Sequence, residues 1–209
     1  MMKLNIYRIP AGIYAANCYV IFSDDTKSGI VVDPGGSADE IIDFVEKNNI
    51  DLKYIVLTHG HGDHIGGVKE IKDKYKIPVL IHEDDADMLT DASKNLSGTM
   101  ASGPIEINAD KTLKDGEIIK FGDLEALVLH TPGHTKGGIC LKIQDHILTG
   151  DTLFKGSIGR TDLYSGDYET LIKSIKTKLL VLSDELIVLP GHGQPSTIRN
   201  ERLSNPFFN

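Results

Sequence analysis

Four short apolar segments of this chain each run directly into a turn that carries His or Asp, and no other feature limits the possible folds as strongly. The segments span residues 54–57, 127–129, 147–148 and 187–189, and the turns after them span residues 58–64, 130–134, 149–151 and 190–193. Short apolar runs bounded by turn residues are typical of buried β-strands. Because rigid strands direct the loops that follow them toward one crevice, we expect the four turns to meet at one edge of a fold that mixes helices and strands.

Further strands and helices alternate along the rest of the chain. Strands are expected at 20–22, 30–33, 79–82, 118–121, 124–129 and 139–143, and helices around 37–45, 68–75 and 171–179. Ser37 to Glu40 has the form of a capping box at the start of the first helix, and Asp167 is the expected N-cap of the last. Apolar density falls between residues 91 and 117, which predicts a long connection or lid. A length of 209 residues fits one domain, residues 1–209.

The first of the four turns holds four metal-ligating side chains within six positions, namely His59, His61, Asp63 and His64. On a helix, two residues that are two positions apart point about 200° away from each other around the axis. In an extended loop the same two residues face the same way. A cluster of this density is difficult to explain by packing alone, so it indicates a metal site.

Together the four turns supply five imidazoles and two carboxylates: His59, His61, Asp63, His64, His134, Asp151 and His192. One catalytic zinc takes about three protein ligands and a water, so this set suits two adjacent ions that share a carboxylate. It contains no thiolate, and imidazole–carboxylate sets suit zinc, iron or nickel. His82, His130 and His146 lack such surroundings, and we expect structural roles for them, with His130 a candidate for orienting a ligand.

Charge and hydropathy limit the partners. The chain carries 22 basic and 30 acidic residues, a net charge of -8, with no basic run. Because nucleic-acid binding relies on clustered Lys and Arg, nucleic acid is not expected as a partner. No apolar stretch reaches the roughly 18 residues of a membrane span, and residues 1–10 lack the apolar region of a secretory leader. These features, with Cys18 and Cys140 expected as buried thiols, predict a cytoplasmic monomer or homodimer without membrane contact.

The turn from Thr58 to His64 resembles the H-x-H-x-D-H signature of the metallo-β-lactamase superfamily. The later turns resemble the later metal motifs of that superfamily in the same order, and they read Thr131-Pro132-Gly133-His134-Thr135, Gly150-Asp151 and Pro190-Gly191-His192-Gly193. The resemblance covers nearly the whole chain. It implies an α/β (α+β) fold, a four-layer αββα sandwich in which two sheets pack face to face between helices, with a metal centre at one edge.

The resemblance also implies how the ligands divide between two metals. His59, His61 and His134 would hold one metal, Asp63, His64 and His192 would hold the second, and Asp151 would bridge them.

Within the superfamily, residues 153–162 most resemble the small glyoxalase II-like hydrolases, which cleave S-acylglutathione thioesters such as S-lactoylglutathione. Arg160 matches a position where relatives direct a basic side chain toward glutathione, and Tyr164, shortly after it, is expected to line the substrate pocket. The chain ends soon after His192, so we expect no helical C-terminal domain with further glutathione contacts.

These interpretations predict a metal-dependent thioesterase with two divalent metal ions, zinc being favoured and iron or manganese the alternatives. Two cations lower the pKa of a bound water from about 16 toward about 7. The expected catalytic groups are Asp63 and the metal-bound hydroxide, which attacks the carbonyl of a small-molecule thioester. A thiolate leaves with a pKa of about 8.5 and needs little help from an acid.

Two alternatives stay open. Persulfide dioxygenases also carry a Gly-Arg-Thr-Asp stretch like residues 159–162, but they hold one iron through two His and one carboxylate. The other alternative is a metal-binding module without turnover.

Overall fold

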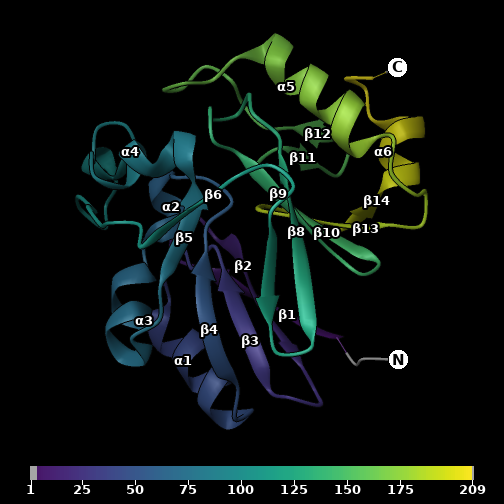
Figure 1. Ribbon diagram of the computed structural model, residues 1–209. Coiled ribbons are helices and arrows are strands. Elements are labelled where there is room, and N and C mark those ends of the chain that lie inside the picture. The colour runs from purple at the N-terminus through teal and green to yellow at the C-terminus, as the bar shows by residue number, and fades with distance from the viewer. Residues whose placement is uncertain (1–3, 209) are drawn as a thin grey trace.

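Two β-sheets of six strands each lie face to face in this computed structural model, which describes residues 4–208 (Figure 1). Residues 1–3 and 209 of the predicted single domain lie outside the described part. In pairing order, the first sheet consists of β1 (Leu4–Ala11), β2 (Ala16–Ser23), β3 (Ser28–Val32), β4 (Asp51–Val56), β5 (Val79–His82) and β6 (Lys111–Leu113). The second consists of β14 (Ser196–Thr197), β13 (Ile187–Pro190), β10 (His146–Gly150), β9 (Ile139–Ile143), β8 (Leu124–His130) and β7 (Ile118–Phe121). A small antiparallel pair is formed by β11 (Leu153–Phe154) and β12 (Ser157–Ile158).

Helices form the outer layers of the sandwich (Figure 1). The α-helices are α1 (Ala38–Lys47), α2 (Gly62–Ile65), α3 (Val68–Tyr75), α4 (Ala86–Leu89), α5 (Tyr168–Ser174) and α6 (Ile198–Ser204). Two short 3-10 turns are η1 (Glu83–Asp85) and η2 (Ser97–Thr99), and a π-turn, η3 (Ile175–Leu179), continues α5. Helices α1 and α3 pack on the first sheet, and α5, η3 and α6 pack on the second. No helix within residues 4–208 combines the length and the apolar character that crossing a bilayer requires.

The core has three apolar layers because successive side chains of a strand point to opposite faces of its sheet. Ile30 and Val32 of β3 lie in the layer between the sheets, which also contains Phe121 and Val128 of the second sheet. Val31 lies in the layer beneath α1 and α3. Strand β3 is therefore covered on both faces and is apolar at consecutive positions. This arrangement confirms the expected αββα sandwich.

The strand directions bring the ligand-bearing turns to one edge. Strands β8 and β10 are each antiparallel to β9, and β13 is parallel to β10, so the carboxyl ends of β8, β10 and β13 lie at the same edge of the second sheet. In the first sheet, β3 and β4 are parallel, and the turns after them also start from a common edge.

Two local predictions are wrong. Ser37 does not cap α1: its backbone φ is 49°, and its hydroxyl accepts a hydrogen bond from the Gly12 backbone N–H at 3.2 Å. The region 91–117 is not only a connection, because β6 lies within it and pairs in parallel with β5. The Asp167 cap is confirmed, since its carboxylate accepts the Thr170 N–H at 2.7 Å.

Several elements lacked a prediction. Strand β1 pairs along its whole length with β2. Strand β14 and helix α6, which follow the His192 turn, were not expected either.

Candidate metal centre

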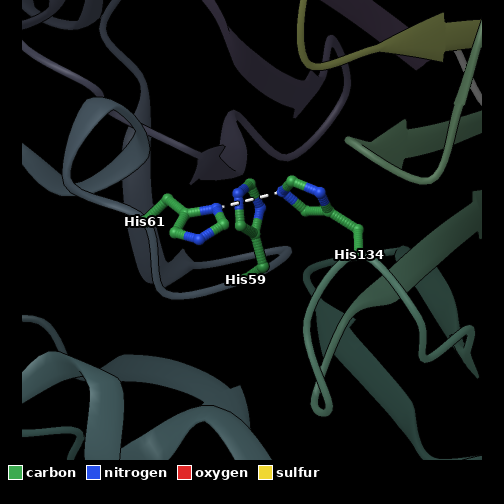
Figure 2. Close-up of side chains that lie close together, drawn as sticks. All are labelled: His59, His61 and His134. Carbon is green, nitrogen blue, oxygen red and sulfur yellow. Dashed lines mark hydrogen bonds between the residues drawn. The ribbon is translucent and has the colours of Figure 1, made fainter. Parts of the chain in front are cut away.

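His59, His61 and His134 form one cluster at the meeting edge of the sheets (Figure 2). His61 Nδ1 and His134 Nε2 are 3.0 Å apart. The ligand atoms of all three side chains lie within 4.8 Å of one another, and all three residues are buried. Two turns that are distant in sequence, one after β4 and one after β8, therefore present three imidazoles to one point.

A second cluster, Asp63, His64 and His192, lies directly beside the first. His192 Nε2 is 3.1 Å from Asp63 Oδ2 and 3.3 Å from His64 Nε2. Asp151 faces both clusters: its Oδ1 is 3.5 Å from His64 Nε2, and its Oδ2 is 3.7 Å from His134 Nε2. The structure thus brings together all seven side chains that the four turns were predicted to supply.

Close backbone approach at the last turn depends on Gly191. A Cβ atom at this position would lie 2.4 Å from Asp151 Oδ1, which is closer than real Cβ contacts. Asn17 of β2 holds the same turn from the opposite sheet, because its backbone N–H donates to the Gly191 carbonyl at 2.7 Å and its side-chain amide donates to Pro190 and Gly193. Asn17 had no assigned role in the sequence interpretation.

Asp33, which the sequence interpretation also missed, orients two of the histidines. This buried carboxylate follows β3 and accepts the Thr58 hydroxyl proton at 2.6 Å and the Thr58 backbone N–H at 2.7 Å. Its Oδ2 is also 3.1 Å from His64 Nδ1. Because the only hydroxyl proton of Thr58 goes to Asp33, Thr58 Oγ1 accepts from His59 Nδ1, 3.1 Å away.

The hydrogen bonds at the Nδ1 atoms leave the Nε2 atoms available as ligands. His59 donates to Thr58 Oγ1, His64 donates to Asp33, and His134 donates to the Arg160 backbone carbonyl at 2.8 Å. Metal-ligating histidines almost always donate their second ring N–H in this way. Carboxylate and carbonyl partners therefore set three of the imidazoles in a metal-binding orientation.

Buried polar atoms without a partner support the same interpretation. Within residues 4–208, His59 Nε2, His61 Nε2 and Asp151 Oδ1 are buried and have no hydrogen-bond partner. Buried polar groups are normally paired, so orphaned nitrogen and oxygen atoms at the centre of a His–Asp cluster are the expected sign of bound cations. The set of five imidazoles and two carboxylates fits divalent zinc, iron or manganese.

Burial and neighbouring charges shift the pKa values of the cluster in different directions. Burial, with the charge of His134, lowers the pKa of His61 to about 3, and burial also lowers the pKa of His59. Burial alone would lower the pKa of His64, but the carboxylates of Asp151 and Asp33 outweigh it and raise this pKa to about 10. His59 and His61 are therefore neutral near pH 7, as metal binding requires.

The carboxyl group of Asp63 is ionised in the same pH range. Burial alone would raise its pKa, but the hydrogen bond from His192 and the charge of His64 lower the pKa well below the usual range.

A pocket of about 280 Å³ opens directly over the two clusters. Its walls include the ligands His61, Asp63, His134 and Asp151, together with Tyr14, Asn95, Leu96, Thr99, Met100, Arg160 and Leu163. Arg160, a predicted substrate contact, lies at this pocket, and its guanidinium forms two hydrogen bonds of 2.8 Å with Asp162. Tyr164 does not line the pocket; its side chain is 43% exposed and its hydroxyl donates to Asp87.

The remaining histidines and the cysteines lie outside both clusters. His82 and His130 stack with ring centroids 3.9 Å apart and planes within 13°. Nitrogen lone pairs lie in the ring planes, so two parallel rings do not converge on one ion, although Asp84 is close enough to complete a set of three. Cys18 and Cys140 are buried free thiols, as expected.

Comparison with known proteins assigns the chain to a family. The model described as the metallo-beta-lactamase superfamily matches residues 11–192. The chain is 39% identical to the protein named hydroxyacylglutathione hydrolase GloC of Haemophilus influenzae, with 99% of each sequence covered. The chain therefore belongs to the metallo-β-lactamase superfamily, whose members are metal-dependent hydrolases with a fold that typically binds two divalent metals.

Two solved structures are similar over nearly the whole chain. The crystal structure of the BLEG-1 B3 metallo-beta-lactamase has a TM-score of 0.93 and 37% identity, with 98% of this chain and 100% of that chain covered. The crystal structure of TTHA1623 in a di-iron-bound form has a TM-score of 0.86 and 30% identity, with 96% and 99% covered.

Proposed function

We propose that this chain is a binuclear metal-dependent hydrolase of thioesters of the hydroxyacylglutathione type. The observation that carries the proposal is the floor of the pocket, where two adjacent sets of imidazole and carboxylate ligands meet with Asp151 between them. The similarity to a protein named hydroxyacylglutathione hydrolase, along the full length of both sequences, supports the thioester class.

In this proposal His59, His61 and His134 hold the first ion, and Asp63, His64 and His192 hold the second. The two oxygens of Asp151 face one histidine of each set, which supports a bridging role. Zinc is the proposed metal, since a set of imidazoles and carboxylates without thiolate suits it. The di-iron form of TTHA1623 supports iron as the first alternative.

Two bound divalent ions would lower the pKa of a water toward about 7 and stabilise negative charge on the carbonyl oxygen. Asp63 contributes an ionised carboxylate at the pocket wall, where it can accept a proton at Oδ1 or Oδ2 from an attacking water. Departure of a thiolate, with a pKa of about 8.5, requires no strong acid. The acid–base demands of thioester cleavage are therefore met by the side chains at the pocket.

Substrate binding would use the cationic and apolar walls of the pocket. The Arg160–Asp162 pair is exposed, and exposed ion pairs contribute only about 0–1 kcal/mol. A substrate carboxylate can therefore replace Asp162 at low cost and use the two-pronged geometry of the guanidinium. Leu96, Met100 and Leu163 offer apolar surface to the remainder of the substrate.

The test combines metal content with rates on a substrate panel. The zinc-loaded chain is assayed with S-lactoylglutathione, a small uncharged thioester, its oxygen ester, a lactone and a β-lactam. We expect the highest kcat/KM on S-lactoylglutathione, two metal ions per chain, and loss of turnover after chelation with recovery on adding zinc. A higher kcat/KM on the β-lactam, or full activity after thorough chelation, contradicts the proposal.

A matched pair of variants tests the site itself. His134→Ala removes a ligand and should lose both metal and turnover, whereas His146→Ala removes a histidine outside the clusters and should keep both. Oxygen consumption with glutathione persulfide and one iron per chain would instead support the persulfide dioxygenase alternative. Two bound ions without turnover on any substrate would support the non-catalytic module.

A further inference from the structure

We propose that Asp85 is a positioning residue that fixes the turn carrying His59 and His61 against the turn carrying His134. This inference rests on the metal-ligand assignment proposed above, and it goes beyond that assignment because Asp85 is not one of the ligands. Asp85 lies in η1, directly after β5, and its side chain is 0% exposed.

The Asp85 carboxylate accepts three hydrogen bonds from two different turns. From the first turn, the Gly60 backbone N–H donates to Oδ2 at 3.2 Å. From the second turn, the Thr135 hydroxyl donates to Oδ2 at 2.7 Å and the Gly137 backbone N–H donates to Oδ1 at 2.6 Å. One rigid group therefore connects segments that are separated by about 75 residues of sequence.

The three donors are immediate neighbours of the first metal cluster. Gly60 lies between His59 and His61, and Thr135 directly follows His134. The distance between His61 and His134 therefore depends on a carboxylate that receives hydrogen bonds from both sides. Groups that orient metal ligands in this way change metal affinity by about 10- to 100-fold when they are replaced.

The local packing is built for this close approach. A Cβ atom on Gly137 would lie 2.5 Å from the Asp85 backbone nitrogen and 2.8 Å from the Asp85 Cβ. Only glycine leaves room for the second turn to reach the carboxylate. The segment 82–85 also supports the same turn through His82, which stacks on His130, and the His130 ring is 2.9 Å from the Lys136 carbonyl.

Glu201 provides a matched control for the effect of losing a buried carboxylate. It is also 0% exposed, and it accepts hydrogen bonds from Gly156 and Asn205, each at 2.8 Å, neither of which lies in the turns that carry the first cluster. Replacing Glu201 therefore removes a buried acceptor of the same kind without touching the turns that Asp85 connects. A difference between Asp85 and Glu201 variants reports position rather than general loss of stability.

The first experiment needs no metal. Amide hydrogen exchange is measured by NMR in the metal-free chain for the wild type, Asp85→Asn and Glu201→Gln. We expect the Gly60 and Gly137 amides to exchange at least 10-fold faster in Asp85→Asn, and to keep wild-type exchange in Glu201→Gln. Unchanged exchange at both amides in Asp85→Asn would overturn the proposal.

The second experiment follows cobalt(II) titration by its visible absorption spectrum. We expect Asp85→Asn to weaken one of the two binding equivalents by about 10- to 100-fold, while Glu201→Gln stays within about threefold of the wild type. Equal losses in the two variants, or no loss in Asp85→Asn, would overturn the positioning role. A wild-type chain that binds no cobalt would overturn the metal assignment, whereas the amide exchange tests Asp85 separately.

A milder variant covers the case in which Asp85→Asn does not fold. Thr135→Val keeps the carboxylate and the shape of the side chain but removes one of the three donors. We expect a smaller loss of cobalt affinity, of several-fold, with faster exchange at the Gly137 amide. Wild-type values for both quantities would contradict the proposal.

Discussion

Replacing Asp33 with Ala should destabilise the metal-free protein more than any other single change near the site that spares the ligands. Asp33 is 2% exposed and accepts hydrogen bonds from the Thr58 backbone, the Thr58 hydroxyl and His64 Nδ1. Each buried donor that is left unsatisfied costs about 1–3 kcal/mol. Because the three donors share one acceptor group, their costs are not additive, and we expect a loss of about 3–5 kcal/mol.

The isosteric variant separates charge from shape. Asp33→Asn retains one acceptor oxygen but turns an amide N–H₂ toward the remaining donors, so we expect a smaller loss of about 2–3 kcal/mol. Asp33 also has a backbone φ of 50°, a conformation that Asn tolerates better than Ala. The predicted order of stability is wild type, then Asp33→Asn, then Asp33→Ala.

Urea unfolding at pH 7 in the presence of a chelator measures these values. The chain contains no Trp, so far-UV circular dichroism is the suitable signal. Asp39→Ala, which removes an exposed carboxylate from the first turn of α1, is the control and should cost less than about 1 kcal/mol. A loss below about 1 kcal/mol for Asp33→Ala would show that Thr58 and His64 find other acceptors and would refute the argument.

Three further predictions concern pH and substrate binding. Burial lowers the pKa of His61 to about 3, so its stabilising contribution is present above pH 6.5 and is lost as the pH falls toward 3; urea unfolding of His61→Gln should show a shallower loss over this range. Since the carboxylates around His64 raise its pKa to about 10, metal binding at pH 8 should release a proton that His64→Gln does not release, measured by pH-stat titration. Arg160→Ala should raise KM for S-lactoylglutathione at least fivefold with little change in kcat, whereas Tyr164→Phe, outside the pocket, should leave both unchanged.

The sequence made the strand-end ligands visible because their signal is local. An apolar run followed by His or Asp is read from a few consecutive residues, and each such run proved to be a strand directed at the same edge. Strand β6 carried no such signal, since three residues become a strand only by pairing with β5. Ser37 misled for the opposite reason: the capping pattern was present, but a tertiary contact with Gly12 took its hydroxyl.

The partners of the ligands escaped prediction because their signal is not local. Asp33 stands in an Asp-Pro-Gly-Gly turn, which is explained equally well by the turn itself. Asp85 ends the run Glu83-Asp84-Asp85, which has the character of a solvated surface, yet only Asp85 of the three is buried. The pattern after β3 was nonetheless the same as after the other strands, an apolar run ending in a carboxylate, and that was the usable signal for Asp33.

Arg160 shows most clearly why residue type alone does not reveal such a role. Its backbone carbonyl accepts the Nδ1–H of His134, while its guanidinium lies at the pocket wall beside Asp162. Any residue type supplies a carbonyl, so orientation of His134 leaves no trace in the identity of residue 160. The two functions are therefore separable in one variant: Arg160→Ala removes the guanidinium and keeps the carbonyl, and it should weaken substrate binding while two metal ions per chain remain bound.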